Sequence, residues 1–204
     1  MSPRPAIDHI RKPQILRAAA EVITERGLTA TRIVDVAERA GTSAPAVLYW
    51  FDSREQLLTE ALIADETEFA ETLDARLAPL VSARAKLLEI LESTVSDGDL
   101  SLWIELWARS LHDPESRVSR RRLDVAWRER IAAAVSEGQE RGEFDAALDA
   151  GAFAVKLAAL IDGLSVQVTL ADPDVSAERM LEICVEFADL ELGTELRAAL
   201  EEVV

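Results

Sequence analysis

The 204-residue chain has one cysteine, Cys184, and two histidines, His9 and His112. A single cysteine cannot form an internal disulfide, which agrees with a reducing compartment. These three residues are also too few for a zinc cluster of Cys and His ligands, and the Glu-x-x-His pair of di-iron proteins is absent. We therefore expect no metal and no cofactor. Cys184 lies in the apolar stripe of a predicted helix, which favours an inert buried thiol over a redox sensor.

The usual sequence signatures of enzymes are also missing. No Gly-x-Ser-x-Gly elbow, P-loop or Gly-x-Gly-x-x-Gly motif occurs. The 38 acidic residues are typical of solvated helix faces rather than of paired catalytic carboxylates. No window approaches 18 uninterrupted apolar residues, and residues 1–13 lack the apolar stretch of a secretory signal. The sequence thus predicts a cytoplasmic protein that is neither an enzyme nor a membrane protein.

No alternating run of β-branched residues appears, so the predicted fold class is all-α with strand content near zero. Apolar residues recur at helical spacing along the chain, and Gly, Pro and Asp mark the breaks. The predicted helices cover residues 13–26, 33–40, 53–77, 83–95, 100–111, 114–140, 149–170 (or from 145) and 176–192, with a short last helix from 194.

Residues 33–55 have the pattern of a helix-turn-helix. Ile33, Val36, Ala37 and Ala40 fall at helical spacing and give the first short helix a buried stripe, and Gly41 suits the αL conformation that ends it. Thr42 or Ser43 can cap the next helix, and Pro45 fits its first turn. Helices joined so tightly cross steeply, which lets the second helix enter a major groove. An ordinary helical hairpin has the same pattern, so this segment alone leaves both interpretations open.

The first sixty or so residues resemble the TetR family of one-component transcriptional repressors. The similarity runs without a gap through residues 18–27 (AAAEVITERG), 31–41 (TRIVDVAERAG), 42–51 (TSAPAVLYWF) and 53–58 (SREQLL). The chain departs from the family pattern at Leu48, where Tyr is frequent, at Pro45, where Gly is usual, and at Arg54, where Lys is usual. Residues 106–117, 138–144 and 161–164 resemble the regulatory domains of the family, especially its betaine-regulator-like branch.

The resemblance implies a three-helix helix-turn-helix domain at residues 1–56, here called the head, and a helical-bundle effector-binding and dimerisation domain at residues 57–204. The implied function is that of a homodimeric repressor that binds a pseudo-palindromic operator on double-stranded DNA and responds to a small-molecule effector. The alternative is a helical adaptor protein whose head has lost DNA binding.

The candidate DNA-binding residues lie on the second short helix and on its two flanks. Residues at the start and outer face of that helix are expected to reach base edges and phosphates: Thr42, Ser43, Ala44, Pro45, Val47 and Tyr49. Arg32 and Arg54 are expected to clamp the phosphate backbone, and Lys12 and Trp50 complete the set.

The charge of the chain is distributed unevenly. Residues 1–60 hold eight basic and eight acidic residues, so the remaining residues carry the whole formal charge of −16. A neutral head can still bind phosphate if Arg4, Arg11, Lys12, Arg32 and Arg54 share a face. The acidic remainder is expected to weaken nonspecific binding and to orient the head toward DNA.

An aromatic group in the second region is the candidate effector site. Trp103 and Trp107 lie one helical turn apart, and Trp127 and Phe153 are on neighbouring segments. These rings fit either a plain core or the lining of an apolar cavity between helices. Polar residues within apolar runs are candidates for fixing a ligand, namely Arg128, Asp162 and Gln167.

Residues 152–170 are apolar nearly all round, so a helix there needs cover on several sides. A symmetric partner would supply that cover, although a central position within one subunit would also do so. The candidate interface residues are Phe153, Leu157, Leu160, Ile161, Leu164, Val168, Leu181, Val185 and Phe187.

Overall fold

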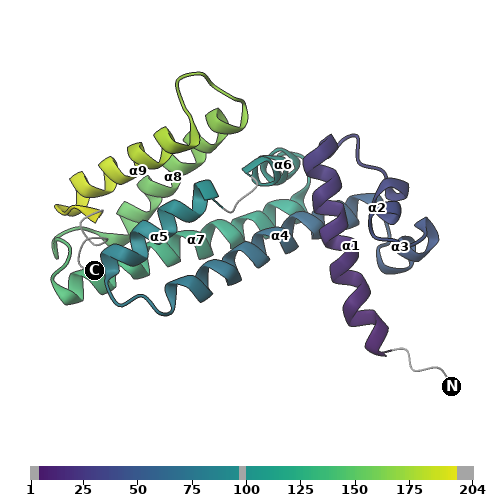
Figure 1. Ribbon diagram of the computed structural model, residues 1–204, viewed down its shortest axis with the longest axis horizontal. Helices are drawn as coiled ribbons and strands as arrows, with labels where there is room; N and C mark the ends of the chain where they lie inside the picture. Colours follow the sequence, from purple (N-terminus) through teal and green to yellow (C-terminus); the bar gives the residue numbers. More distant parts are fainter. Residues whose placement is uncertain (1–4, 97–99, 197–204) are drawn as a thin grey trace. The chain divides into compact units, whose positions relative to one another are not determined.

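The computed structural model describes the backbone of residues 5–96 and 100–196, and the side chains of residues 11–96 and 100–196. Every regular element in this part of the chain is a helix, which confirms the all-α prediction (Figure 1). The helices are α1 (Pro5–Arg26), α2 (Ile33–Arg39), α3 (Ala44–Trp50), α4 (Arg54–Leu77), α5 (Ala83–Ser96), α6 (Leu100–Ser110), α7 (Pro114–Arg141), α8 (Ala150–Thr169) and α9 (Ala177–Leu192).

The chain forms two compact units. The first unit comprises Met1–Glu68 and Ser101–Arg120, and the second comprises Phe69–Leu100 and Arg121–Val204. The first unit therefore contains α1, α2, α3 and all of α6 except Leu100, and the second contains α5, α8 and α9, whereas α4 and α7 are divided between the two. The units follow packing rather than order along the chain, and the boundary between residues 56 and 57 stays a prediction.

The predicted helix bounds agree with the structure except at the two ends of the chain. We predicted that the first helix begins at Pro13, but α1 begins at Pro5 and contains Pro13 in its interior. An internal proline removes one backbone hydrogen bond without necessarily ending a helix, so it is a poor marker of a helix start. The short helix predicted from Thr194 falls mostly on residues outside the described part.

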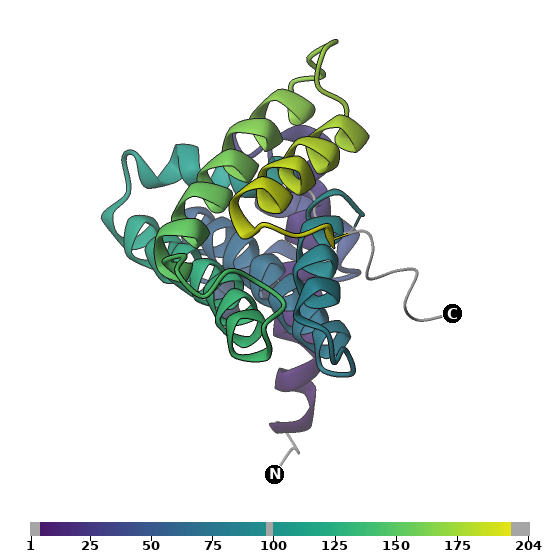
Figure 2. The same cartoon turned by 90° about the vertical axis from the view of Figure 1, so that its left-hand side faces the viewer.

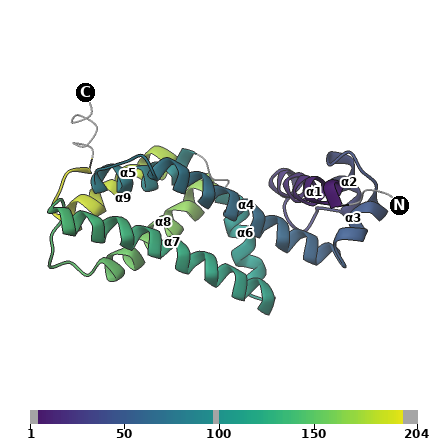
Figure 3. The same cartoon turned by 90° about the horizontal axis from the view of Figure 1, so that it is seen from below.

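The turn between α2 and α3 forms as its residue types predict. Gly41 has φ +62° and lies in the left-handed region that ends α2 at low cost. The side chain of Ser43 caps α3 by accepting a hydrogen bond from the N–H of Ala46 at 3.3 Å. The buried residues of α2 and α3 are Val36, Ala37 and Val47. α2 packs against α1 and also against α3 (Figure 3). A helix-turn-helix is therefore present in the first unit.

The core of the second unit is built from the apolar faces of α5, α7, α8 and α9 together with the last turns of α4, which contribute the buried Leu73. α8 and α9 lie side by side, and α5 packs against α9 (Figure 2). Cys184 is buried in this core, and burial raises the pKa of its thiol to about 12, as expected for an inert cysteine. Within the described part of the chain, α8 is long and apolar enough to cross a membrane by length and composition alone. Core helices pass the same test, and seven α8 residues are buried.

The turn that follows α7 explains the residue pattern at 138–144. A Cβ atom on Gly138 would lie 2.1 Å from Cδ2 of the buried Phe144 ring, so glycine is required for this packing. The Glu143 carboxylate accepts hydrogen bonds from the N–H groups of Ala83 and Arg84, at 3.2 and 3.0 Å, and from Ser82 Oγ at 2.9 Å. Glu143 thus satisfies the first N–H groups of α5.

Candidate nucleic-acid interface

The exposed face of α3 carries the residues that are best placed to touch a base edge. Leu48 is 49% exposed and Tyr49 is 78% exposed, and Pro45 precedes them by one helical turn on the same face. Ser43 is exposed at the start of the helix, and Thr42 and Ala44 are half-buried. The ring of Trp50 is half-buried and meets the ring of Tyr49 edge to face, with centroids 5.3 Å apart.

One predicted base-reading residue was wrong. Val47 is completely buried against the rest of the first unit and cannot reach DNA. We placed it on the outer face because α3 has only seven residues, which is too short for the periodicity to separate neighbouring positions. Its neighbour Leu48, which we noted only as a departure from the family pattern, occupies the exposed position instead.

Arg32 is accessible but already paired. Its guanidinium donates two hydrogen bonds to Asp35, at 2.9 and 3.0 Å, and its side chain is 70% exposed. The hydrogen bond from Arg32 lowers the pKa of Asp35 to about 2, and the nearby charge of Arg26 contributes. The exposed Arg32 side chain remains a candidate for contacting phosphate.

Arg54 does not have the free guanidinium that a phosphate clamp requires. Its Nε donates to the carbonyl of Thr31 at 2.7 Å, and its Nη2 donates to the carbonyls of Leu28 and Thr29 at 2.5 and 3.1 Å. Its Nη1 pairs with Glu55 at 3.2 Å. We correct the prediction accordingly: Arg54 binds the turn between α1 and α2, and nothing in the sequence around it shows this distant partner.

The predicted basic face is largely neutralised by acidic partners. Lys12 pairs with Glu60 at 2.7 Å and lies 5.3 Å from the centroid of the Phe51 ring. Arg11 is exposed, and its side chain has no hydrogen bond or ion pair within the described residues, which makes it the more available cation of α1. Arg4 lies outside the described residues.

Two residues of α6 contact the α1–α2 turn and the start of α4, and no sequence pattern pointed to either of them. Glu105 Oε1 accepts a hydrogen bond from the N–H of Leu28 at 3.0 Å. Arg109 donates to the carbonyl of Glu55 and to Ser116 Oγ, both at 3.2 Å. Because these partners are 50 or more positions apart in the sequence, except for Ser116, no local pattern could reveal them.

The candidate effector residues are divided between the two units. Trp103 and Trp107 belong to the first unit, with ring centroids 5.9 Å apart, and the guanidinium of Arg120 lies 5.3 Å from the centroid of the Trp107 ring. Trp127 belongs to the second unit and packs 6.2 Å from Phe69.

The remaining effector candidates do not form a cluster. Phe153 is buried and stacks on Phe187, so it fills the core and was wrongly assigned to a ligand. Arg128 and Asp162 are half-buried, and Gln167 is exposed with one long hydrogen bond of 3.5 Å to Gly163.

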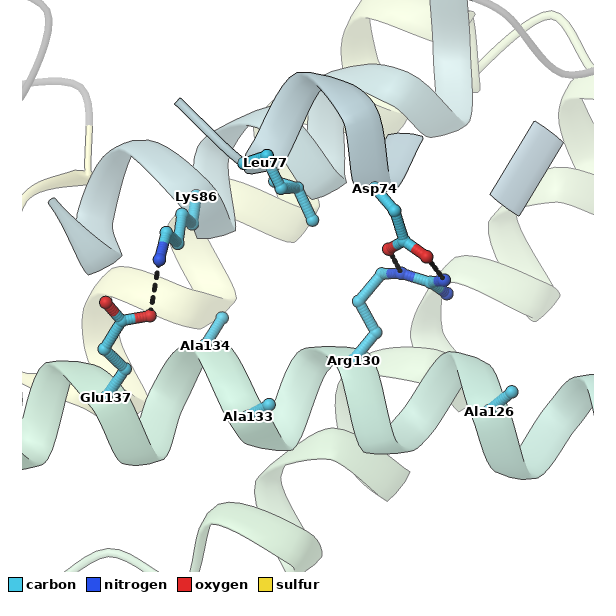
Figure 4. A pocket seen from close by; sticks show the side chains of 9 residues that line it. Asp74, Leu77, Lys86, Ala126, Arg130, Ala133, Ala134 and Glu137 are labelled. Atoms are coloured by element: carbon cyan, nitrogen blue, oxygen red, sulfur yellow. Dashed lines mark hydrogen bonds and ion pairs between the residues drawn. The ribbon is translucent and has the colours of Figure 1, made fainter. Parts of the chain in front are cut away.

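The second unit also contains an open groove of about 470 Å³ between α7 and the helices α4 and α5. Figure 4 shows alanines of α7 on its floor and an ion pair on either side. Arg130 binds Asp74 through two hydrogen bonds of 2.7 and 2.8 Å, and Lys86 pairs with Glu137 at 2.6 Å. None of the predicted effector residues lines this groove.

Five of the predicted interface residues were wrong because they are buried within a single subunit: Phe153, Leu157, Ile161, Leu164 and Val185. The partly buried Leu160, Val168, Leu181 and Phe187 pack against the same core. The opposite side of α8 carries a stripe of small and apolar residues that are exposed or half-buried, namely Ala152, Val155, Ala159, Gly163 and Val166, followed by the C-cap residue Leu170. The exposed Lys156, which pairs with Glu191, borders this stripe.

An exposed recognition helix presented by a helix-turn-helix defines a DNA-binding transcriptional regulator, not an enzyme. Comparison with known proteins identifies its family. Residues 15–61 match the bacterial regulatory proteins of the tetR family, and residues 79–193 match the C-terminal domain of BetI-type transcriptional repressors. The chain belongs to the TetR family, with a BetI-type C-terminal domain.

Transcriptional regulators named BetI are similar to this chain over nearly their whole length. The transcriptional regulator BetI of Cronobacter sakazakii is 30% identical over 94% of this chain and 95% of its own. BetI of Escherichia coli strain K12 is 30% identical over 95% of this chain and 100% of its own. A regulator from Saccharomonospora viridis, solved in complex with choline, superposes with a TM-score of 0.83 at 30% identity and covers 90% of this chain and 98% of its own.

Proposed function

We propose that this regulator is a homodimeric repressor that reads a pseudo-palindromic operator through α3 and releases it when a small cationic effector binds. The observation that carries this proposal is the exposed face of α3, where Pro45, Leu48 and Tyr49 project from a capped helix. Apolar side chains at these positions suit contact with thymine methyl groups in the major groove. The proposed place of action is the cytoplasm, where such a regulator meets its operator.

The outer side of α8 supports the homodimer. It presents Val155 at 53% exposure and Leu170 at 75% exposure, separated by the small residues Ala159 and Gly163. Small residues let two helices approach closely, and a contiguous exposed apolar face marks an interaction site. A two-fold axis brings the same face of a second copy against it, which places two recognition helices on one operator.

The Trp103–Trp107 pair is the proposed effector site. An aromatic face attracts a quaternary ammonium ion, and the guanidinium over Trp107 indicates that this ring face accepts a cation. The indole Nε1–H of Trp107 is buried and has no acceptor within the described residues. A ligand hydroxyl at this N–H would remove the cost of an unsatisfied donor. Choline has both groups, and it is the ligand of the Saccharomonospora viridis relative.

The position of this pair on α6 suggests how an effector would reach the DNA-binding surface. Trp103 and Trp107 share one face of α6, and Glu105 and Arg109 lie on roughly the opposite face, since two residues turn a helix by more than half a circle. Glu105 and Arg109 contact the head, so a ligand that shifts α6 changes contacts on both faces. The ligand acts only if it prefers one arrangement over the other.

A gel-shift assay with the DNA upstream of the protein's own gene tests the proposal. At low salt the wild-type protein should bind this DNA, and millimolar choline should release it and change the tryptophan fluorescence. Trp107→Ala should keep DNA binding and lose the choline response, whereas Trp127→Phe in the second unit should keep both.

Each failure has a distinct meaning in this assay. Absence of DNA binding by the wild type at low salt would support the adaptor alternative. DNA binding that choline leaves unchanged would reject the quaternary ammonium effector and keep the regulator. A response lost in Trp127→Phe but kept in Trp107→Ala would move the effector site to the second unit.

A further inference from the structure

Both backbone polar groups of Leu28, its N–H and its carbonyl, form hydrogen bonds with charged side chains from distant helices. Its N–H donates to Glu105 Oε1 of α6 at 3.0 Å, and its carbonyl accepts from Arg54 Nη2 of α4 at 2.5 Å. Leu28 directly follows Gly27, whose φ of +76° ends α1. Thus Leu28, the second residue after α1, is bound by a carboxylate from one helix and by a guanidinium from another.

The same two helices fix the rest of this turn. Arg54 also donates to the carbonyls of Thr29 and Thr31, at 3.1 and 2.7 Å. The buried hydroxyl of Thr31 donates to the carbonyl of Gly27 at 2.9 Å. These bonds satisfy the backbone groups of a turn that has no repeating helix or sheet partner. Hydrogen bonds to charged groups are about twice as strong as neutral ones, so the turn has a defined geometry.

The turn determines where α2 begins, and α2 packs directly against α3. A change in the turn therefore moves the helix that presents Leu48 and Tyr49 to DNA. We propose that Glu105 and Arg54 are positioning residues for operator reading, which hold the α1–α2 turn from two sides without touching DNA. This inference rests on the proposed reading of an operator by α3.

A direct phosphate contact by Arg54 is the competing explanation, and salt dependence separates the two. A residue that binds phosphate contributes to counterion release, and affinity therefore falls as salt rises. Removal of that residue makes the slope of log affinity against log salt shallower by about one per contact. A positioning residue changes affinity and leaves that slope unchanged. The nitrogen atoms Nε, Nη1 and Nη2 of Arg54 all have protein partners, which favours the positioning role.

The test uses the full-length variants Glu105→Ala, Glu105→Gln and Arg54→Ala, with Glu129→Ala as the matched control. Glu129 is exposed on α7, and its side chain has no hydrogen bond or ion pair within the described residues. Amide hydrogen exchange at Leu28 directly reports the hydrogen bond from its N–H to Glu105. Operator affinity at several salt concentrations reports the effect of that bond on DNA binding.

In Glu105→Ala the Leu28 amide should exchange about tenfold faster or more, because a hydrogen bond to a charged group is lost. Operator affinity should fall by roughly three- to tenfold, with the wild-type salt slope and helical content. Glu105→Gln keeps an acceptor oxygen and should lie between wild type and Glu105→Ala in both measurements. Arg54→Ala should weaken operator binding at constant slope, and Glu129→Ala should match the wild type.

Unchanged exchange at Leu28 in a folded Glu105→Ala protein would overturn the proposal that Glu105 holds the α1–α2 turn. If that variant does not fold, wild-type exchange and affinity in Glu105→Gln together with a reduced salt slope in Arg54→Ala would overturn the proposal. A wild-type protein that binds no operator would reject the proposed function, while the exchange data would still show whether Glu105 holds the turn.

Discussion

Adjacent positions on α3 differ completely in their environment. Val47 is buried in the first unit, and Leu48 is 49% exposed on the face that also carries Pro45 and Tyr49. None of these exposed residues has a long amide or guanidinium group. Readout by this helix should therefore depend on thymine methyl contacts and DNA shape more than on bidentate hydrogen bonds.

Replacing Leu48 with Glu should abolish specific DNA binding without unfolding the protein. The new carboxylate would lie beside the phosphate backbone, and such like-charge contacts lower affinity by roughly a hundredfold or more. Val47→Glu is the contrasting variant, because it buries an unpaired charge and should destabilise the first unit by about 3 kcal/mol or more. Fluorescence anisotropy with operator DNA and thermal unfolding measure the two effects. Full operator affinity in a folded Leu48→Glu protein would show that this face of α3 is not the reader.

Glu143 should make the second unit sensitive to acid. Burial raises the pKa of its carboxyl group, but hydrogen bonds from the N–H groups of Arg84 and Ala83 and from Ser82 outweigh burial and hold the pKa below the ordinary value of 4.5. A carboxylate with a lowered pKa in the folded state stabilises the protein above its ordinary pKa, and this stabilisation is lost as pH falls through the folded-state pKa.

Glu143→Ala should therefore cost about 1–2 kcal/mol at pH 7, as loss of a helix cap does, and the difference from wild type should shrink below pH 4. Urea unfolding at both pH values gives the comparison. Glu140→Ala, which removes an exposed carboxylate three residues earlier, should show no such pH-dependent loss. A difference between Glu143→Ala and wild type that is independent of pH would contradict the role of the charge.

At the scale of helices, local residue patterns predicted most of the fold. Ser43 caps α3, Asp149 caps α8 and Ser176 caps α9 at or next to the predicted starts, because caps depend on residues within one turn. The pattern at residues 138–144 is also local, since Gly138 and Phe144 meet across the turn.

Partners across the fold could not be predicted in the same way. α8 is apolar nearly all round, so periodicity did not show which stripe the subunit itself buries. The structure buries Leu157, Ile161 and Leu164 and exposes Val155 and Ala159. The bond from Leu28 to Glu105 joins residues 77 positions apart, and the bonds from Arg54 to the α1–α2 turn span more than 20 positions. Such bonds depend on how helices pack, and no spacing within a helix encodes them.

Gly138→Ala tests the packing of the turn after α7. Alanine favours a helix over glycine by about 1 kcal/mol, but its Cβ would lie 2.1 Å from Phe144 Cδ2. Forcing an atom into a packed core costs about 1–3 kcal/mol, so a net loss of stability is expected in chemical denaturation. The double variant Gly138→Ala with Phe144→Leu should recover part of that loss. A Gly138→Ala protein more stable than wild type would mean that the ring moves away at little cost.

At the scale of the whole molecule, the distribution of charge suits a regulator that binds selectively. Residues 1–60 are neutral in sum and the remainder carries −16. Ion pairs such as Lys12–Glu60 also occupy basic side chains of the first unit. Weak general attraction to phosphate makes the proposed operator binding depend on the fit of two recognition helices to two half-sites, which requires the proposed dimer.

The outer face of α8 is the proposed dimer interface, so a substitution on this face should dissociate the dimer. Each large apolar side chain that becomes buried contributes roughly 1.5–3 kcal/mol, and symmetry doubles the contribution of Val155, Leu170 and their neighbours. The summed free energy of burial offsets an association cost of about 4–15 kcal/mol only if the whole face is buried without interruption. A charge at the centre of the face should therefore dissociate the dimer.

Ala159→Glu should therefore give a folded monomer of 22.4 kDa in sedimentation experiments at micromolar concentration, whereas the wild type should have twice that mass. Leu164→Glu does not serve this purpose, because Leu164 is buried within the subunit and its replacement would disrupt the core. Ala147→Glu adds the same charge at an exposed turn and should remain dimeric. The Ala159→Glu monomer should also lose cooperative operator binding, because a monomer brings only one recognition helix to a two-half-site operator. A dimeric Ala159→Glu protein, or a monomeric wild type, would exclude this face of α8 as the interface.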